Sequence, residues 1–266
     1  MTNRSIFMKP AIFIALLLSV SFARSQGMTD VEKQLIVDYR QIDYWRSHID
    51  LPDTIDWVDS LGHADTTFHE QLTKILNKYP ESLDYDFPAL RDSGFVITTS
   101  NDGCFRIYAW DNESGGSMRY FDHVLQYKTN SGTRATSLTG TAEDQEIGWY
   151  LMISPFRTKK STYYLAFSRS QISGSGRVET VSSFKIDKDS LLGPIKLFKK
   201  GNQRQDNVGL EFMSFSFPRV PALTLQTLVY DTVHHTIKVP QLDDLFGNPT
   251  GHYTLYRWTG KYFYAK

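Results

Sequence analysis

Several features are scarce in this 266-residue sequence, and each scarcity narrows the class of protein. Cys104 is the single cysteine, so no disulfide can form within the chain. Because it lies in an alternating apolar stretch, we expect a packed side chain rather than a nucleophile. Lys and Arg total 29, as do Asp and Glu, so no net charge draws the chain to nucleic acid or to an anionic membrane. We expect no nucleic-acid partner.

Motifs of well-known enzyme classes are also missing. The chain has no GxSxG, no P-loop and no glycine fingerprint for a dinucleotide. Carboxylate pairs for glycoside hydrolysis stay open, because their separation in space is not visible in a sequence. We expect no cofactor, and we interpret the protein as non-catalytic without excluding an enzyme.

The N-terminus is typical of an export signal, which we assign to residues 1–25. Arg4 and Lys9 precede the apolar run Ala11 to Ala23, and small residues follow it. As a helix this run spans about 20 Å, short of the roughly 30 Å of a bilayer core, so we expect no stable membrane insertion. Cleavage before Gln26 is preferred over cleavage before Arg24. The protein is expected in the periplasm or outside the cell.

Residues 26–88 are predicted to form a helical N-terminal region. Thr29 and Glu32 are spaced as a capping box, and so are Thr67 and Glu70. Apolar residues recur at three- and four-residue steps after each box. Between the two helices, residues 53–61 are expected to form a short helix ending at Gly62.

Residues 89–266 are predicted to form an antiparallel β-domain, either a sandwich or a barrel, with a small propeller as the alternative. The segments are short, rich in aromatic and β-branched residues and separated by turn sequences. No long helical pattern interrupts them, which excludes a sheet of βαβ units. The predicted strands are residues 95–99, 105–110, 118–128, 149–153, 162–168, 178–186, 195–199, 210–217, 227–230, 236–239, 253–258 and 262–264.

An internal echo marks the candidate ligand-binding residues. The pattern Gly, any, aromatic, any, aliphatic, Tyr, any, Trp occurs at residues 103–110 and 251–258. Alternation along a strand places Tyr108 with Trp110, and Tyr256 with Trp258, on one face. If that face is open, these rings and Arg106 are the candidate site for a carbohydrate or another small ligand. Core packing is the alternative that we favour.

The stretch from Thr99 to Asp111, followed by Gly115 to Met118, resembles a segment of uncharacterised secreted proteins of Bacteroidetes. The resemblance covers about a tenth of the chain. It implies secretion and brings no assigned activity.

Three groups of metal-ligand residue types are predicted not to bind metal. Helical spacing makes His69 and Glu70 diverge, and the HExxH pattern fails at Thr73. His234 and His235 fit a polar hairpin tip better than a shared metal. His63 and Asp65 belong to the first group. The third group, Asp111 and Glu113, could offer oxygen ligands to Ca²⁺, but the loop lacks the full calcium-loop pattern and a turn with solvated acids is favoured.

Two functions therefore remain open. The first is an exported non-catalytic binding or envelope-associated protein that recognises a small ligand or an envelope protein. The second is a hydrolase of an extracellular or envelope polymer, with acids from loops at strand ends such as Asp102, Asp111 and Glu113.

Overall fold

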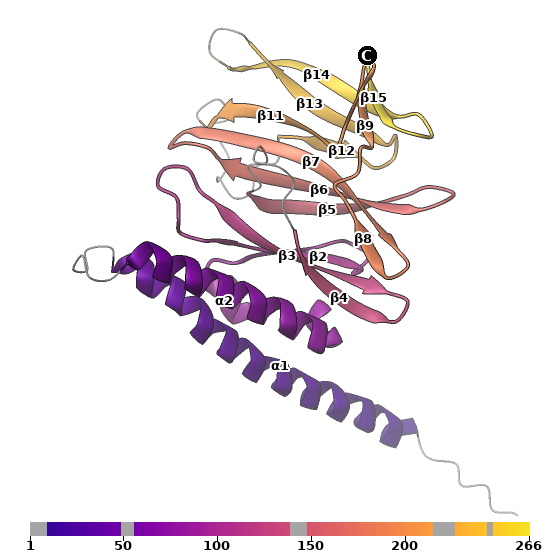
Figure 1. The fold of residues 1–266 in the computed structure, drawn as a ribbon. Coiled ribbons are helices and arrows are strands. Elements are labelled where there is room, and N and C mark those ends of the chain that lie inside the picture. The colour runs from indigo at the N-terminus through magenta and orange to yellow at the C-terminus, as the bar shows by residue number, and fades with distance from the viewer. Residues whose placement is uncertain (1–9, 49–55, 139–147, 215–226, 244–246) are drawn as a thin grey trace, which may run out of the picture.

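The computed structural model describes residues 10–48, 56–138, 148–214, 227–243 and 247–266, with side chains described from Gly27 onward. Two long helices lie against three stacked sheets (Figure 1). The fold is mainly β with a helical N-terminal region, as predicted. The predicted leader at residues 1–25 stays a prediction.

The helical elements are α1 (Pro10–Ser47), α2 (Trp57–Lys78), the 3-10 helix η1 (Pro80–Leu83) and α3 (Pro88–Asp92). The Asp56 side chain caps α2 by accepting from the backbone N–H groups of Val58 and Asp59. The helix ends at Lys78, because Pro80 cannot continue its hydrogen-bond pattern. Gly62 lies inside α2, so the predicted short helix ending there is wrong.

Neither expected capping box begins a helix. Thr67 and Glu70 lie in the middle of α2, and Thr29 and Glu32 lie inside α1. Glu32 is buried and accepts hydrogen bonds from the Leu90 amide at 3.0 Å and from the Tyr85 hydroxyl at 2.9 Å. Its carboxylate fixes the connection after η1 rather than the start of a helix.

The first sheet packs directly on the helices. Its strands are β1 (Val96–Thr99), β2 (Phe105–Asp111), β3 (Phe121–Thr129) and β4 (Gly132–Ser137), paired antiparallel in that order. The core between this sheet and α1 and α2 includes Leu35, Phe68, Leu72, Phe95 and Trp110.

The second sheet is the middle layer. It contains β5 (Trp149–Arg157), β6 (Thr162–Gln171), β7 (Gly176–Asp187) and β11 (Asn207–Met213), with the short β8 (Ser190–Leu192) beside β7. Residues 164–170 of β6 are all buried, since other sheets cover both faces of this layer. The same continuous burial occurs in β2 of the first sheet, which lies between the helices and the middle sheet, whereas β14 of the third sheet is largely exposed.

The third sheet closes the opposite end of the molecule from the helices (Figure 1). Its strands are β9 (Phe198–Lys200), β10 (Gln203–Gln205), β12 (Val229–Asp231), β13 (Thr236–Leu242), β14 (Pro249–Trp258) and β15 (Phe263–Ala265). Their order is β10-β9-β15-β14-β13-β12, and β15 pairs parallel with β9 while the other pairs are antiparallel. The described strands thus form open sheets stacked face to face, as the sandwich prediction required.

Candidate functional site

The structure packs the two candidate ring pairs of the internal echo, Tyr108 with Trp110 and Tyr256 with Trp258, into the protein interior. Tyr108 and Trp110 are fully buried on the face of β2 that meets the helices, whereas Phe105 and Ile107 face the middle sheet. The alternation predicted for this strand is therefore confirmed.

The second copy of the echo packs between the middle and third sheets. Tyr256 is buried there, and the half-buried ring of Trp258 lies 4.8 Å from that of Phe156 and 5.2 Å from that of Phe263. Of the two alternatives, core packing is the one that this arrangement matches, and ligand binding by these rings stays a prediction.

Arg106 also points inward. Only 5% of its surface is exposed, and its guanidinium donates to the Ser82 carbonyl at 3.1 Å, to the Tyr85 carbonyl and to the Thr99 hydroxyl at 2.7 Å. Its contacts join the first sheet to the η1 region rather than forming a surface site.

The three acids suggested for hydrolysis already form ion pairs or hydrogen bonds with neighbouring groups of the protein. Asp111 contacts Arg119 at 2.7 Å, and Glu113 contacts Arg46 at 3.3 Å. Asp102 accepts from the Ser100 hydroxyl at 2.7 Å and from the Cys104 amide at 3.2 Å, which closes a turn. These three residues do not line a common cavity in the described part of the chain.

The histidine pair lies in the turn between β12 and β13, as expected for a hairpin tip. Asp231 accepts from the backbone amides of Val233 and His234 and contacts the His234 ring at 2.8 Å. His235 instead contacts the Tyr230 hydroxyl at 3.2 Å. The two rings have separate partners.

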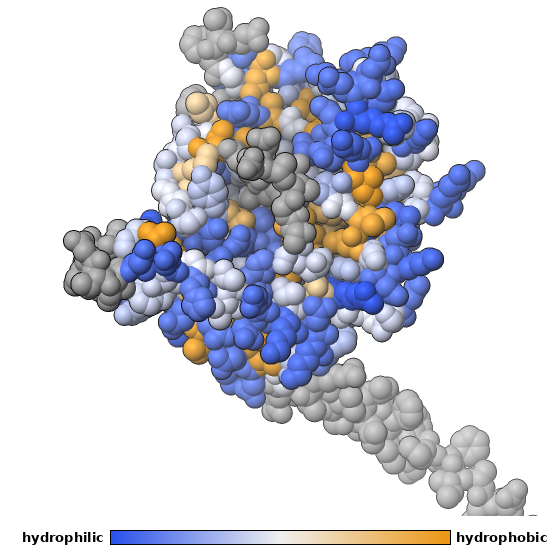
Figure 2. All heavy atoms as spheres, viewed as in Figure 1, coloured by the Kyte–Doolittle hydropathy of each residue, from blue (hydrophilic) through white to orange (hydrophobic). Residues whose placement is uncertain are grey.

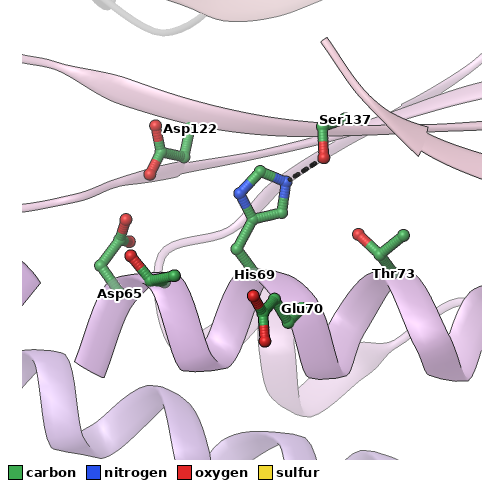
Figure 3. A pocket seen from close by; sticks show the side chains of 7 residues that line it. Asp65, His69, Glu70, Thr73, Asp122 and Ser137 are labelled. Carbon is green, nitrogen blue, oxygen red and sulfur yellow. Dashed lines mark hydrogen bonds between the residues drawn. The ribbon is translucent and has the colours of Figure 1, made fainter. Parts of the chain in front are cut away.

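A cavity of about 450 Å³ lies between α2 and the first sheet (Figure 3). We call it the acidic cavity. Five of its residues come from one face of α2, where three- and four-residue steps bring side chains together, while β3 and β4 supply Asp122 and Ser137. The lining residues are Asp65, Thr66, His69, Glu70, Thr73, Asp122 and Ser137.

The carboxyl groups of Asp65 and Asp122 face each other across this cavity within hydrogen-bonding distance (Figure 3). Burial, together with the Asp122 carboxyl, raises the pKa of Asp65 to about 8, while the hydrogen bond from the Trp110 indole opposes this rise. Burial and the neighbouring carboxyl group thus both favour the protonated form of Asp65 near neutral pH.

His69 lies beside the carboxyl pair. Its Nε2 atom is 2.9 Å from the Ser137 hydroxyl, and its other ring nitrogen faces Asp122 (Figure 3). Burial lowers the pKa of His69, which favours the neutral imidazole at neutral pH. The ring also meets the Trp110 ring edge-on at 5.4 Å, so its orientation is fixed by the core.

Thr73 adds a further polar group to the cavity. Its Oγ1 atom is buried and has no hydrogen-bond partner in the structure. A buried hydroxyl without a partner costs about 1–3 kcal/mol, and a bound ligand could supply the missing bond.

Sequence reasoning identified part of this cavity. Asp65, His69 and Glu70 were singled out as a possible metal cluster, but Thr73 was treated only as a failed ligand position, and Asp122 and Ser137 were missed. The available signal was Asp122 itself, an acid beside a histidine near the start of a strand. Among the side chains described from residue 27 on, no three His, Cys, Asp or Glu converge on a position that could hold a metal ion.

We compared the chain with known protein families, curated proteins and solved structures. No family model, curated protein or solved structure matches it. None of the helices in the described ranges has the length and apolar character needed to cross a membrane.

Proposed function

We propose that this protein is an exported, non-catalytic binding protein whose ligand occupies the acidic cavity. The observation that carries the proposal is the convergence of Asp65 and Asp122 on a space that also contains the unpartnered Thr73 hydroxyl. A cavity of about 450 Å³ is within the size range of small-molecule sites, in which convergent polar groups fix the orientation of the ligand.

The chemistry of the lining selects the ligand. A carboxylate accepts from ammonium and hydroxyl groups, the protonated Asp65 donates one hydrogen bond, and the Ser137 and Thr73 hydroxyls both donate and accept. None of the described lining side chains is Lys or Arg. A small molecule carrying an amine and several hydroxyls, such as an amino sugar, is therefore the ligand class that we favour.

Titration calorimetry with glucosamine tests this proposal, with glucose as the neutral comparison. We expect glucosamine to bind more tightly than glucose, because the ammonium group meets the carboxyl pair. Replacing Asp122→Asn should weaken glucosamine binding by about tenfold or more. Thr73→Val should weaken it without unfolding the protein, since it removes an unsatisfied hydroxyl.

The matched control is Asp84→Asn, which removes the same charge at an exposed position outside the cavity. The affinity of the Asp84→Asn variant for glucosamine should equal that of the unchanged protein. Absence of binding to both sugars, or equal losses in the Asp122 and Asp84 variants, would contradict the proposal.

Export is tested separately. Intact-mass measurement of protein recovered from the periplasm or medium should give a chain that begins at Gln26 or Arg24. A full-length chain recovered from the membrane fraction would oppose the assignment of residues 1–25 as a signal.

The contact between Ser137 and His69 favours a second candidate, a serine hydrolase of an envelope polymer. A nucleophile beside a neutral base is the arrangement that such chemistry uses. We rank it second because two nearby carboxyl groups oppose the negative oxyanion that must develop. A fluorophosphonate probe decides between them: labelling of Ser137 that is lost in Ser137→Ala would favour the hydrolase.

A further inference from the structure

The outer face of the third sheet carries a row of basic side chains set by strand register. Arg204 pairs with Lys199, Lys199 with Tyr264, and Tyr264 with Arg257. The alternate residues of β9 and β15, Phe198, Phe263 and Ala265, are buried against the middle sheet. Since side chains alternate across a strand, the four residues of the row point outward.

The residues of the row lie on adjacent strands, so neighbouring residues of the row are about 4.8 Å apart, which is the spacing between strands. Lys238 lies on the same face, two residues from the row on β13, because Thr236 pairs with Arg257. We call this surface the basic face. It comprises Lys199, Arg204, Lys238, Tyr264 and Arg257, flanked by the exposed Lys196, Lys200 and Lys261.

The cations of the basic face have no carboxylate partner among the described residues. None of them contributes to an ion pair with an Asp or Glu side chain. Asp231 lies at the far end of the same register row, opposite Thr236, but its carboxylate is bound by the His234 turn. The positive charge on this face is thus left for an external partner.

The net charge of the whole chain does not reveal the positive charge of the basic face. Acidic residues outnumber basic ones in the helices and first sheet, whereas basic residues prevail in the third sheet, within a chain whose formal charges sum to zero. Figure 2 shows the surface around the third sheet, at the upper right, as strongly hydrophilic. The basic face is therefore a local region of positive charge at the end of the molecule opposite the helices.

We propose that the basic face binds an acidic polysaccharide, a linear chain that carries carboxylate or sulfate groups. Cations on β10, β9, β14 and β13 present hydrogen-bond donors along this face to an extended polyanion. Charge complementarity carries the argument. This surface is distinct from the acidic cavity, which favours a cationic ligand.

The aromatic rings on this face distinguish a polysaccharide from single-stranded nucleic acid. Bases stack on open aromatic faces. Here the Arg204 guanidinium lies 4.6 Å from the centre of the Tyr262 ring and the Lys261 ammonium 5.4 Å from it, while Lys199 lies 5.9 Å from the centre of Tyr264. Cations already occupy positions over these rings, which disfavours stacking of bases.

A membrane surface fits the row less well. Membrane-bound faces combine cations with apolar side chains that enter the lipid. The row from Arg204 to Arg257 itself contains no large apolar side chain that is exposed. Beyond the row, the exposed Val229 pairs with Lys238 at the β12 edge, and the exposed Tyr253 lies four residues from Arg257 on β14, so the apolar side chains are few and scattered.

The test measures binding to fluorescent heparin at low salt, with neutral dextran, single-stranded DNA and phosphatidylglycerol vesicles as the other arms. We expect the full chain to bind heparin in preference to all three, with an affinity that falls as salt rises. The double change Lys199→Glu and Arg257→Glu should raise the Kd for heparin by about tenfold or more, because two attractions become repulsions.

The matched control is Lys159→Glu with Lys160→Glu, which changes the net charge equally in the exposed turn between β5 and β6. It should alter the Kd less than twofold, and thermal melts should show both variants folded. Equal weakening by the two variants would overturn the proposal, because net charge alone would explain it. Failure to bind heparin, or a preference for DNA or vesicles, would overturn it as well.

Discussion

The Trp110 indole donates a hydrogen bond of 2.9 Å to the Asp65 carboxyl group, so a fully buried core ring holds one wall of the acidic cavity. The same ring packs against Phe68 at 5.2 Å and Phe95 at 5.5 Å. The position of Asp65 is consequently set by the packing between α1, α2 and β2 rather than by a loop.

Asp65→Asn should change how stability depends on pH. The raised pKa means that folding favours the protonated Asp65, so its contribution to stability is present at low pH and is lost as pH rises from the ordinary carboxyl pKa to about 8. An amide can accept from Trp110 and donate to Asp122 without carrying a charge. We expect the variant to be more stable by about 1 kcal/mol at pH 8 and little changed at pH 4.

Urea melts of this variant at both pH values are the measurement, and Asp84→Asn provides the control. A variant that loses stability at pH 8 would show that Asp65 is ionised and favourably paired in the folded protein.

Trp110→Ala and Trp258→Ala should differ in cost. Trp110 is fully buried and gives a hydrogen bond, so its removal should destabilise the protein by about 3–5 kcal/mol. Trp258 is half-buried between the middle and third sheets, and its removal should cost roughly half as much. Denaturant midpoints of the two variants, measured together, decide the ranking; equal midpoints would contradict it.

Glu179→Ala should be among the most damaging changes in the middle sheet. Glu179 and Arg169 form a buried ion pair, and the Glu179 carboxylate also accepts from the Thr227 and Leu228 amides. Removing the acid leaves a buried guanidinium without its anion, for which about 3–5 kcal/mol is typical. Exposed Glu211 on neighbouring β11 is the control, and Glu211→Ala should stay within about 0.5 kcal/mol. Similar unfolding free energies for the two variants would refute the importance of the buried pair.

A chelator should leave the melting temperature unchanged. Arginines neutralise Asp111 and Glu113, the acids closest to a calcium-loop pattern, and a bound cation would have to displace them. Thermal melts with and without EDTA test this. A fall of several degrees that Ca²⁺ or Zn²⁺ reverses would reveal a metal site in the protein.

Local sequence signals predicted most elements but not all of their ends. Apolar alternation indicated β2, and a short aromatic-rich segment indicated β6; both strands are buried along most of their length. The strands β4, β8 and β10 were not predicted, since segments such as Gln203–Gln205 have no apolar pattern and owe their pairing to neighbouring strands. Gly62 failed as a helix end because tertiary packing of Leu61 and Ala64 carries α2 through it.

The acidic cavity could be predicted only in part, for a geometric reason. Asp65 and His69 are one helical turn apart, so their proximity follows from the sequence. Asp122 and Ser137 reach them only because β3 and β4 pair beside α2, and that packing is not encoded in local spacing. The basic face was missed for a similar reason, because its row crosses four strands from distant parts of the chain.

The position of β15 has a consequence for the order in which the chain folds. This short strand lies between β9 and β14, and Phe263 fills the core beneath them. As the ribosome synthesises the protein, β9 and β14 emerge first but cannot join into one sheet until β15 follows. The third sheet must therefore assemble after synthesis of residues 263–265, and a chain shortened before Phe263 would leave two separated halves with exposed apolar faces.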